Sequence, residues 1–285
     1  MALVHLNFDS RYLSGSTDVN IILPDCARSQ DTRAFYGSGK KYPVLWLLHG
    51  TFGDYSDWLR KTNVELYAGE KNLIVVMPSA QNSDYANWPG FGTGYRAFDY
   101  LTEELMPLVY GWFPASDKRE DNFIAGLSMG GRGAISYAWA WPEKFSVLYS
   151  MSCVPEDMRP AAAELESGEP APNPWAALER ERNRARLQNA GGLEAYLASP
   201  QNIWDRARAV AKRSDMPRMI FSCGTADFVM YRHFKAFRAY AGEIGLNAEF
   251  RETEGYNHEW RYWEKEIQRV IETCLPGGDK GGNAF

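Results

Sequence analysis

The sequence of 285 residues predicts an α/β fold with a mostly parallel central sheet, an antiparallel N-terminal edge and helices on both faces. Two apolar runs without alternation, 44–48 and 72–78, have the pattern of strands that are buried on both faces. A helical stretch between them, about 56–68, completes a strand–helix–strand unit. Residues 3–8 and 16–24 alternate as half-buried strands do, which predicts the antiparallel edge.

The rest of the chain continues to alternate between strands and helices. Short apolar runs predict further strands at 123–125, 145–152, 219–223 and 248–253. Apolar residues at steps of three and four predict amphipathic helices at 98–112, 230–244 and 260–274. Pro107 lies inside the first of these helices, and we expect it to kink the helix because proline has no backbone N–H.

The order of elements is that of one domain, 1–285, since no linker or internal repeat divides it. The segment 155–215 has no strand pattern, and several prolines break its first part. Because it stands between two predicted sheet strands, we interpret it as a cap-like helical insertion within the domain. Residues 277–285 are rich in glycine and are expected to form a flexible tail.

Within the insertion, residues 175–187 predict a charged helix. Its acidic and basic residues recur three positions apart, so they can pair along the helix surface. Two such pairs need only form a solvated face: Glu179 with Arg182, and Glu181 with Arg184.

Composition and charge narrow the class of protein. The formal net charge is −5 and no run of Lys and Arg is present, which argues against a nucleic-acid partner. No stretch of roughly 18 consecutive apolar residues predicts a membrane span, and the N-terminus lacks the pattern of a secretory signal. We therefore expect a cytoplasmic protein. Its four cysteines have no C-x-x-C spacing and are expected to be buried free thiols.

A serine between two glycines is the centre of the predicted site. Gly126, Ser128 and Gly130 fit G-x-S-x-G, preceded by a short apolar strand and followed by a helix with small residues on one face. Such a turn holds the serine hydroxyl at the carboxyl edge of the sheet, where the helix start directs N–H groups toward a developing oxyanion. The pattern predicts an acyl-transfer nucleophile at Ser128.

A serine nucleophile needs a histidine base and a carboxylate that orients it. Among four histidines, His258 lies in the loop after the last predicted strand, and Asp227 lies in the matching loop after the preceding strand. The order Ser128, Asp227, His258 is the order of nucleophile, acid and histidine in the α/β-hydrolase fold. We assign these three residues as the catalytic triad, with Asp205 and Asp215 as weaker candidates for the acid.

Two backbone N–H groups are candidates for the oxyanion hole. One belongs to Met129, directly after the nucleophile, and the other to the turn that follows strand 44–48. The sequence leaves open whether Thr51 or Phe52 provides this second donor. His49, beside the turn, is interpreted as structural.

The histidine and the acid of this triad each have a competing role. His258 with Glu259 begins like the zinc motif H-E-x-x-H, but Tyr262 stands where the second histidine would be, so no metal and no cofactor are predicted. Asp227 could instead be the N-cap of the helix that follows it.

The residues that carry this chemistry resemble a known family. The matching motifs are Leu48-His49-Gly50 with Asp57-Trp58, Gly126-Leu127-Ser128-Met129-Gly130-Gly131, Asp227-Phe228, and His258-Glu259-Trp260 with Tyr262-Trp263-Glu264. They are similar to the esterase D family, closest to its tributyrin-esterase branch of short-chain acyl esterases. The resemblance runs from about residue 2 to 275 and is thin between 155 and 215. It implies acyl-ester chemistry on a small-molecule ester, and a homo-oligomer, because members of that branch are commonly oligomeric.

We therefore expect a serine carboxylesterase that hydrolyses acetyl to butyryl esters through an acyl-enzyme on Ser128. Alternatives are a feruloyl or acetylxylan esterase, an S-formylglutathione hydrolase-like thioesterase, an acyltransferase, and a binding protein that kept the fold without activity. Aromatic residues are expected to contact substrate or narrow the pocket: Phe52, Trp88 and Trp260, and within the insertion Trp175, Tyr196 and Trp204.

Overall fold

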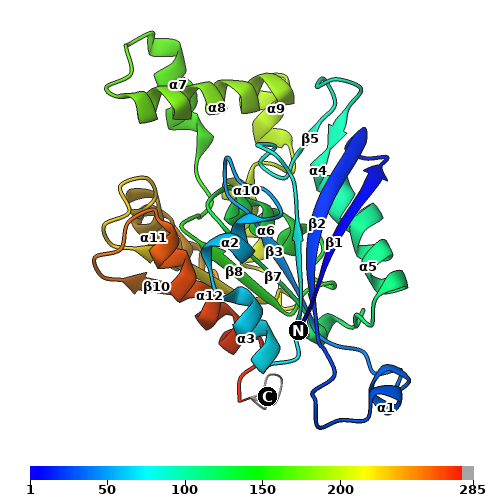
Figure 1. The fold of residues 1–285 in the computed structure, drawn as a ribbon. Helices are drawn as coiled ribbons and strands as arrows, with labels where there is room; N and C mark the ends of the chain where they lie inside the picture. Colours follow the sequence, from blue (N-terminus) through cyan, green and yellow to red (C-terminus); the bar gives the residue numbers. More distant parts are fainter. Residues whose placement is uncertain (278–285) are drawn as a thin grey trace.

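An eight-stranded sheet forms the centre of the molecule (Figure 1). The computed structural model describes residues 1–277, so the predicted tail lies, apart from Gly277, outside the described residues. The strands follow the order β1-β2-β4-β3-β7-β8-β9-β10. Their bounds are Ala2–Ser10 (β1), Gly15–Leu23 (β2), Val44–Leu48 (β3), Ile74–Pro78 (β4), Asn122–Leu127 (β7), Val147–Met151 (β8), Arg218–Gly224 (β9) and Glu249–Thr253 (β10).

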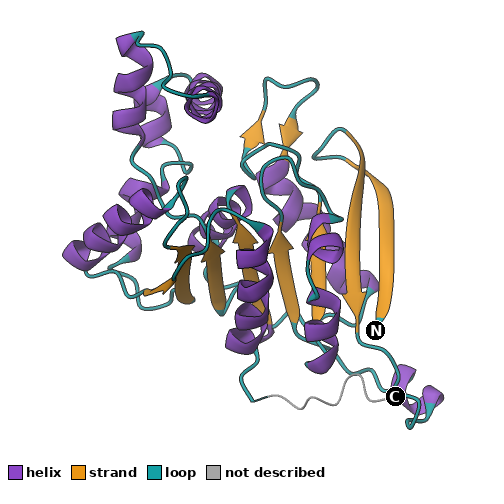
Figure 2. Cartoon of the chain, turned by 60° about the vertical axis from the view of Figure 1, so that its left-hand side comes forward, coloured by secondary structure: helices purple, strands orange, loops and turns teal. Residues whose placement is uncertain are grey.

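Strand directions confirm the predicted sheet. β1 pairs with β2, and β2 with β4, in antiparallel register. Every other neighbouring pair is parallel. The carboxyl ends of the parallel strands therefore meet at one edge, toward which the arrowheads of these central strands point in Figure 2.

Helices cover both faces of the sheet. Those described are Thr32–Tyr36 (α1), Asp57–Lys61 (α2), Val64–Glu70 (α3), Ala97–Asp99 (α4), Met106–Trp112 (α5), Met129–Ala140 (α6), Met158–Ser167 (α7), Pro174–Ala190 (α8), Leu193–Ala198 (α9), Ile203–Val210 (α10), Tyr231–Ile244 (α11) and Trp260–Cys274 (α12). Two apolar clusters lie on opposite faces. One contains α5, α6, α10 and α11, and the other contains α2, α3 and α12.

Strand β3 shows why an unbroken apolar run predicts a central strand. Val44, Trp46 and Leu48 belong to one cluster, whereas Leu45 and Leu47 belong to the other. Because successive side chains of a strand point to opposite faces, a strand covered on both sides must be apolar at every position. All five residues are fully buried.

The single helix expected at 56–68 is divided into two short helices, α2 and α3, so the prediction of one continuous helix was wrong. Thr62 has an extended backbone, and its hydroxyl donates to the carbonyl of Trp58 at 2.5 Å. The backbone N–H of Asn63 donates to Glu264 of α12 at 2.9 Å. These side-chain bonds compete with the helical ladder and end α2 at Lys61.

The helix around Pro107 changes type, and the kink expected there stays a prediction. A π-helical stretch, Tyr100–Leu105, precedes α5, and the backbone N–H of Met106 donates to the carbonyl of Leu101, five residues back. Pro107 has no N–H to donate, and it stands in the first turn of α5, directly after the π-helical stretch.

Four helices occupy the segment between β8 and β9. α10 packs on α6 and α11 and contributes Ile203, Ala207 and Val210 to the apolar cluster there. α7, α8 and α9 lie together on the side of the sheet's carboxyl edge (Figure 1). A short hairpin that the sequence did not predict, β5 (Asn87–Trp88) with β6 (Tyr95–Arg96), stands near them. None of the helices that the structure describes has the length and apolar character to cross a membrane.

Candidate active site

Ser128 stands in a strained turn between β7 and α6. Its backbone has φ 50° and ψ −119°, in a region that residues with a side chain rarely occupy. The turn closes because its flanking positions are glycines. A Cβ on Gly126 would lie 2.3 Å from the backbone of Gly130, and a Cβ on Gly130 would lie 2.4 Å from the carbonyl oxygen of Leu48. Neither backbone can yield, so both positions need glycine.

The structure brings Ser128, His258 and Asp227 into one hydrogen-bonded row. His258 Nε2 is 3.1 Å from Ser128 Oγ, and His258 Nδ1 is 2.9 Å from Asp227 Oδ2. The three residues come from the loops after β7, β10 and β9, which meet at the carboxyl edge of the sheet. This is the arrangement in which a histidine can take a proton from a serine while a carboxylate fixes its tautomer.

Asp227 is held on both of its oxygens. Oδ2 faces His258, and Oδ1 accepts hydrogen bonds from the backbone N–H groups of Val229 and Met230 at 3.0 and 2.8 Å. The carboxylate therefore also fixes the backbone directly before α11. Burial works to raise the pKa of Asp227, but hydrogen bonding and charge from His258 and the N–H of Met230 outweigh it, and the pKa is lowered. Asp227 is therefore ionised at neutral pH.

The imidazole is also fixed in position. The ring of Trp263 meets that of His258 edge to face at 5.1 Å between centroids. Asn257 Oδ1 accepts the backbone N–H of His258 at 2.8 Å. Asp205 instead bonds to Arg159 and Asn202, which places it away from this row.

Other polar candidates have partners elsewhere. Asp215 pairs with Arg213 on the surface. His5 is 2.8 Å from Asp18, and His233 is 3.1 Å from Glu156. None of these residues bonds to the row of Ser128, His258 and Asp227.

The turn after β3 contains both candidate donors, Thr51 and Phe52. Phe52 has φ 65°, and its N–H donates to Asn82 Oδ1 at 2.8 Å. The N–H of Thr51 makes no hydrogen bond to any described residue. Met129 is the first residue of α6, so its N–H also has no helical partner. Of the two candidates for the second N–H donor of the oxyanion hole, Thr51 therefore fits better than Phe52.

His49 holds this turn against the loop that follows β4. Its Nδ1 lies 2.7 Å from the carbonyl oxygen of Gly50, and its Nε2 accepts the N–H of Ala80 at 2.9 Å. Acceptance at Nε2 requires the proton to be on Nδ1, which fixes the neutral tautomer. Burial lowers the pKa of His49 and keeps the ring uncharged. The geometry agrees with a structural role.

A cavity of about 120 Å³ lies beside the Thr51 turn. The residues that line it come from the Thr51 turn, the loop after β4, strand β5 and helix α8: Thr51, Phe52, Asn82, Asp84, Trp88, Leu178, Arg182 and Ala185. Phe52 and Trp88, two of the predicted substrate contacts, are among them. Trp260 is not, because its ring packs edge to face on Trp58 at 5.3 Å and on Trp263 at 5.2 Å.

A buried ion-pair cluster at this cavity was missed by sequence reasoning. Arg186 donates to Asp84 through Nε at 2.6 Å and Nη2 at 3.0 Å, and Arg182 adds a third contact at 3.1 Å. The spacing of Arg182 from Glu179 suggested a purely solvated face. The contact with the buried Asp84 shows that Arg182 also faces the interior. Nothing local in the sequence marks Asp84 as its partner, since the two lie 98 residues apart.

The aromatic residues of the segment 155–215 differ in their surroundings. Trp175 meets Phe228 edge to face at 6.0 Å, close to Asp227. Tyr196 is completely buried and accepts a hydrogen bond from Arg132, so the expectation that it narrows the pocket was wrong. Trp204 stacks on Tyr240 at 4.4 Å and belongs to the packing of α10 on α11.

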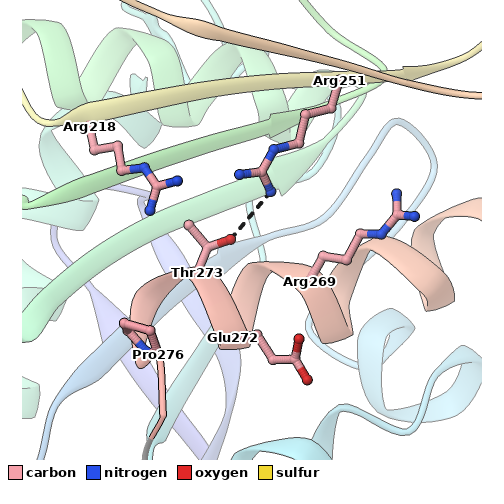
Figure 3. Close-up of a pocket in the computed structure, with 6 residues that line it drawn as sticks. All are labelled: Arg218, Arg251, Arg269, Glu272, Thr273 and Pro276. Carbon is pink, nitrogen blue, oxygen red and sulfur yellow. Dashed lines mark hydrogen bonds between the residues drawn. The ribbon is translucent and has the colours of Figure 1, made fainter.

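A larger pocket, of about 380 Å³, lies elsewhere (Figure 3). It is lined by Arg218, Arg251, Arg269, Glu272, Thr273 and Pro276. Arg218 is the first residue of β9, whereas Asp227 follows the last, so this pocket is at the other end of the strand from the triad. Its arginines pair with glutamates, for example Arg218 with Glu249 at 2.6 Å.

Comparisons with known proteins agree with this fold and site. The model of the Esterase family matches residues 10–272. The S-formylglutathione hydrolase FrmB of Staphylococcus aureus is 32% identical, with a TM-score of 0.73, over 96% of this chain and 98% of its own. The fluorophosphonate-binding serine hydrolase F of Staphylococcus aureus is 29% identical with the same TM-score and coverage. An acetyl esterase of Caldicellulosiruptor saccharolyticus is 26% identical over 95% of this chain and 97% of its own.

The sheet, its strand order and the strained serine turn at its carboxyl edge are those of the α/β-hydrolase fold, as predicted. Within that class the chain belongs to the Esterase family, and it is an esterase.

Proposed function

We propose that the protein is a serine carboxylesterase that hydrolyses short-chain acyl esters, acetyl to butyryl, through an acyl-enzyme on Ser128. The observation that carries the proposal is the hydrogen-bonded row from Ser128 through His258 to the buried Asp227. The unbonded N–H groups of Thr51 and Met129 support it. No cofactor is needed for this chemistry.

The reaction follows from these positions. His258 Nε2 accepts the hydroxyl proton as Ser128 Oγ bonds to the ester carbonyl carbon. The carbonyl oxygen becomes an oxyanion, which the N–H groups of Thr51 and Met129 stabilise. When the bond to the alcohol oxygen breaks, His258 gives that oxygen the proton and the acyl group stays on Ser128. A water molecule, deprotonated by His258, then releases the carboxylic acid and regenerates Ser128.

The cavity beside Thr51 supports a short acyl group. Its volume of about 120 Å³ is below that of an engineered cavity of about 150 Å³ that holds benzene. An acetyl to butyryl substituent fits such a space, and a feruloyl group is too large to be enclosed there. We therefore rank methyl ferulate below short aliphatic esters as a substrate.

Two finer assignments belong with this proposal. We place the chain nearest to the tributyrin-esterase branch of the esterase D family, because its motifs match that branch at the triad. We also propose that the segment 155–215 caps the site, since α8 lines the cavity. Cytoplasmic location and homo-oligomerisation stay predictions.

Replacement of Ser128 by Ala tests the proposal. The variant should lose p-nitrophenyl acetate turnover by about 10⁴-fold or more and should no longer be labelled by a fluorophosphonate probe. Circular dichroism of the parent and the variant separates loss of the nucleophile from loss of the fold. Parent-like turnover by a folded Ser128→Ala variant would overturn the proposal.

A thioester is the second candidate substrate, because the S-formylglutathione hydrolase named above is 32% identical over nearly the whole chain. A formyl group also fits the small cavity. Turnover of S-formylglutathione beside p-nitrophenyl acetate decides between the two. Hydrolysis and acyl transfer are separated by product analysis with an added alcohol acceptor, where dominant transfer would replace the hydrolase assignment.

A further inference from the structure

The cavity and His258 lie on opposite sides of the nucleophile. Ser128 follows β7, His258 follows β10, and Thr51 follows β3, on the other side of β7 in the sheet. The leaving group of an ester must face His258, because His258 Nε2 provides its proton. The acyl substituent then points away from His258, while the oxyanion faces the N–H groups of Thr51 and Met129. On the proposed function, the cavity of about 120 Å³ therefore receives the acyl substituent.

Helix α8 crosses the site from one side to the other. Near its start, Trp175 contacts Phe228, which follows β9. Near its end, the Asn189 side chain donates to the carbonyl of Asn87 in β5, at 2.9 Å. Between these anchors, α8 presents its pocket-lining residues on one face, at spacings of four and three: Leu178, Arg182 and Ala185.

The position of α8 over the cavity is fixed by Asp84. The side chains of Asp84 and Arg186 are 7% and 8% exposed, and they meet through two contacts. Asp84 and the next residue, Tyr85, have φ of 54° and 53°, a conformation that side chains disfavour. The ion pair holds the loop in this conformation and joins it to the helix.

We propose that Asp84, clamped by Arg186 and Arg182, is a specificity-determining residue that sets the depth of the acyl cavity. The clamp keeps α8 at a fixed distance from the Thr51 turn, so that Leu178 and Ala185 close the far wall. Acyl chains beyond butyryl meet this wall. The proposal rests on the proposed function and adds to it the residues that set the chain-length limit.

Rates of p-nitrophenyl esters from two to twelve carbons test the proposal in three variants and one control. Ala185→Leu fills the cavity and should lower kcat/KM for butyrate relative to acetate by roughly tenfold. Leu178→Ala opens the wall and should move the optimum to longer chains by one or two methylenes. Arg186→Ala releases the clamp and should raise the ratio of octanoate to butyrate by roughly tenfold.

Arg184→Ala is the matched control, because Arg184 lies on the same helix and pairs with the exposed Glu181. Its chain-length profile should equal that of the parent. A profile unchanged in Ala185→Leu and Leu178→Ala would overturn the assignment of the cavity. A profile unchanged in a folded Arg186→Ala would overturn the role of the clamp.

Each failure is distinguishable from failure of the proposed function. If Arg186→Ala does not fold, Arg182→Ala, which removes one of the three contacts, takes its place, and a parent-like profile there overturns the clamp. Parent turnover that does not depend on Ser128 would contradict the function itself. Turnover that depends on Ser128 with an unaltered profile in every variant would contradict this inference alone.

Discussion

Arg186 and Asp84 lie 102 residues apart in the sequence, and their side chains form a buried ion pair with contacts of 2.6 and 3.0 Å. The pair joins the segment between β8 and β9 to the loop after β4. A buried charge is costly unless a partner with good geometry compensates it. The pair fixes both side chains in position. It thereby also fixes the wall of the candidate acyl cavity, to which Asp84 belongs.

Acid stability should depend on Asp84. Burial works to raise the pKa of this carboxyl, but the charges of Arg186 and Arg182 outweigh it and hold the pKa well below its ordinary value. Because the native pKa is below the unfolded value of about 3.9, the contribution to stability is complete above that pH and is lost as the pH falls through the native pKa.

Asp84→Asn should therefore lower the free energy of unfolding at pH 7 by about 3–5 kcal/mol, since it leaves buried guanidinium charge without its partner. Below pH 4 its stability should fall less steeply with pH than that of the parent. Urea unfolding at pH 7, 4 and 3 measures both effects. Asp215→Asn, in an exposed pair with Arg213, is the control and should behave as the parent does. Parallel pH curves for Asp84→Asn and the parent would contradict the prediction.

Asp227→Asn should keep the fold and lose activity. The amide oxygen can still accept the N–H groups of Val229 and Met230, but the amide nitrogen would favour the wrong tautomer of His258. We expect kcat for p-nitrophenyl acetate to fall by about 10⁴-fold. Asp205→Asn serves as the comparison and should retain activity. A nearly normal rate in Asp227→Asn would assign the acid to another carboxylate.

Asn82→Ala should weaken the oxyanion turn. The variant removes the acceptor of the Phe52 N–H, so the turn that directs the Thr51 N–H loses its anchor to the loop after β4. We expect kcat to fall by roughly 10-fold to 100-fold, less than the loss of an oxyanion donor itself, with a smaller change in KM. Asn82→Asp keeps an acceptor and should restore most of the rate. Equal rates for the parent and Asn82→Ala would rule out this positioning role.

The thiols should differ in reactivity. All four cysteines are free, Cys153, Cys223 and Cys274 are buried, and Cys26 is half-buried. Burial raises the pKa of the Cys153 thiol to about 12, and it also raises the pKa of Cys223 and Cys274. Since the thiolate is the reactive form, a disulfide reagent at pH 8 should titrate one thiol rapidly in the native protein. Cys26→Ser should abolish that fast phase, and its persistence would show that a buried thiol is accessible.

The sequence by itself determined the sheet and the residues of the candidate triad. An apolar run such as 44–48 predicts a central strand because burial on both faces demands it. Ser128 could be placed because Gly126 and Gly130 are required locally by the turn. Asp227 and His258 followed from their position after strands, since parallel strands end at one edge.

Only the tertiary structure decided how these parts are held. The preference for Thr51 over Phe52 depends on Asn82, which takes the Phe52 N–H from a separate loop. Arg182 was expected on a solvated face because its spacing from Glu179 is local, whereas its contact with Asp84 spans 98 residues. Local patterns report the period of a strand or helix and the demands of a turn. The partner of a polar side chain depends on which loops the fold brings together, and that choice leaves no periodic signal in the chain.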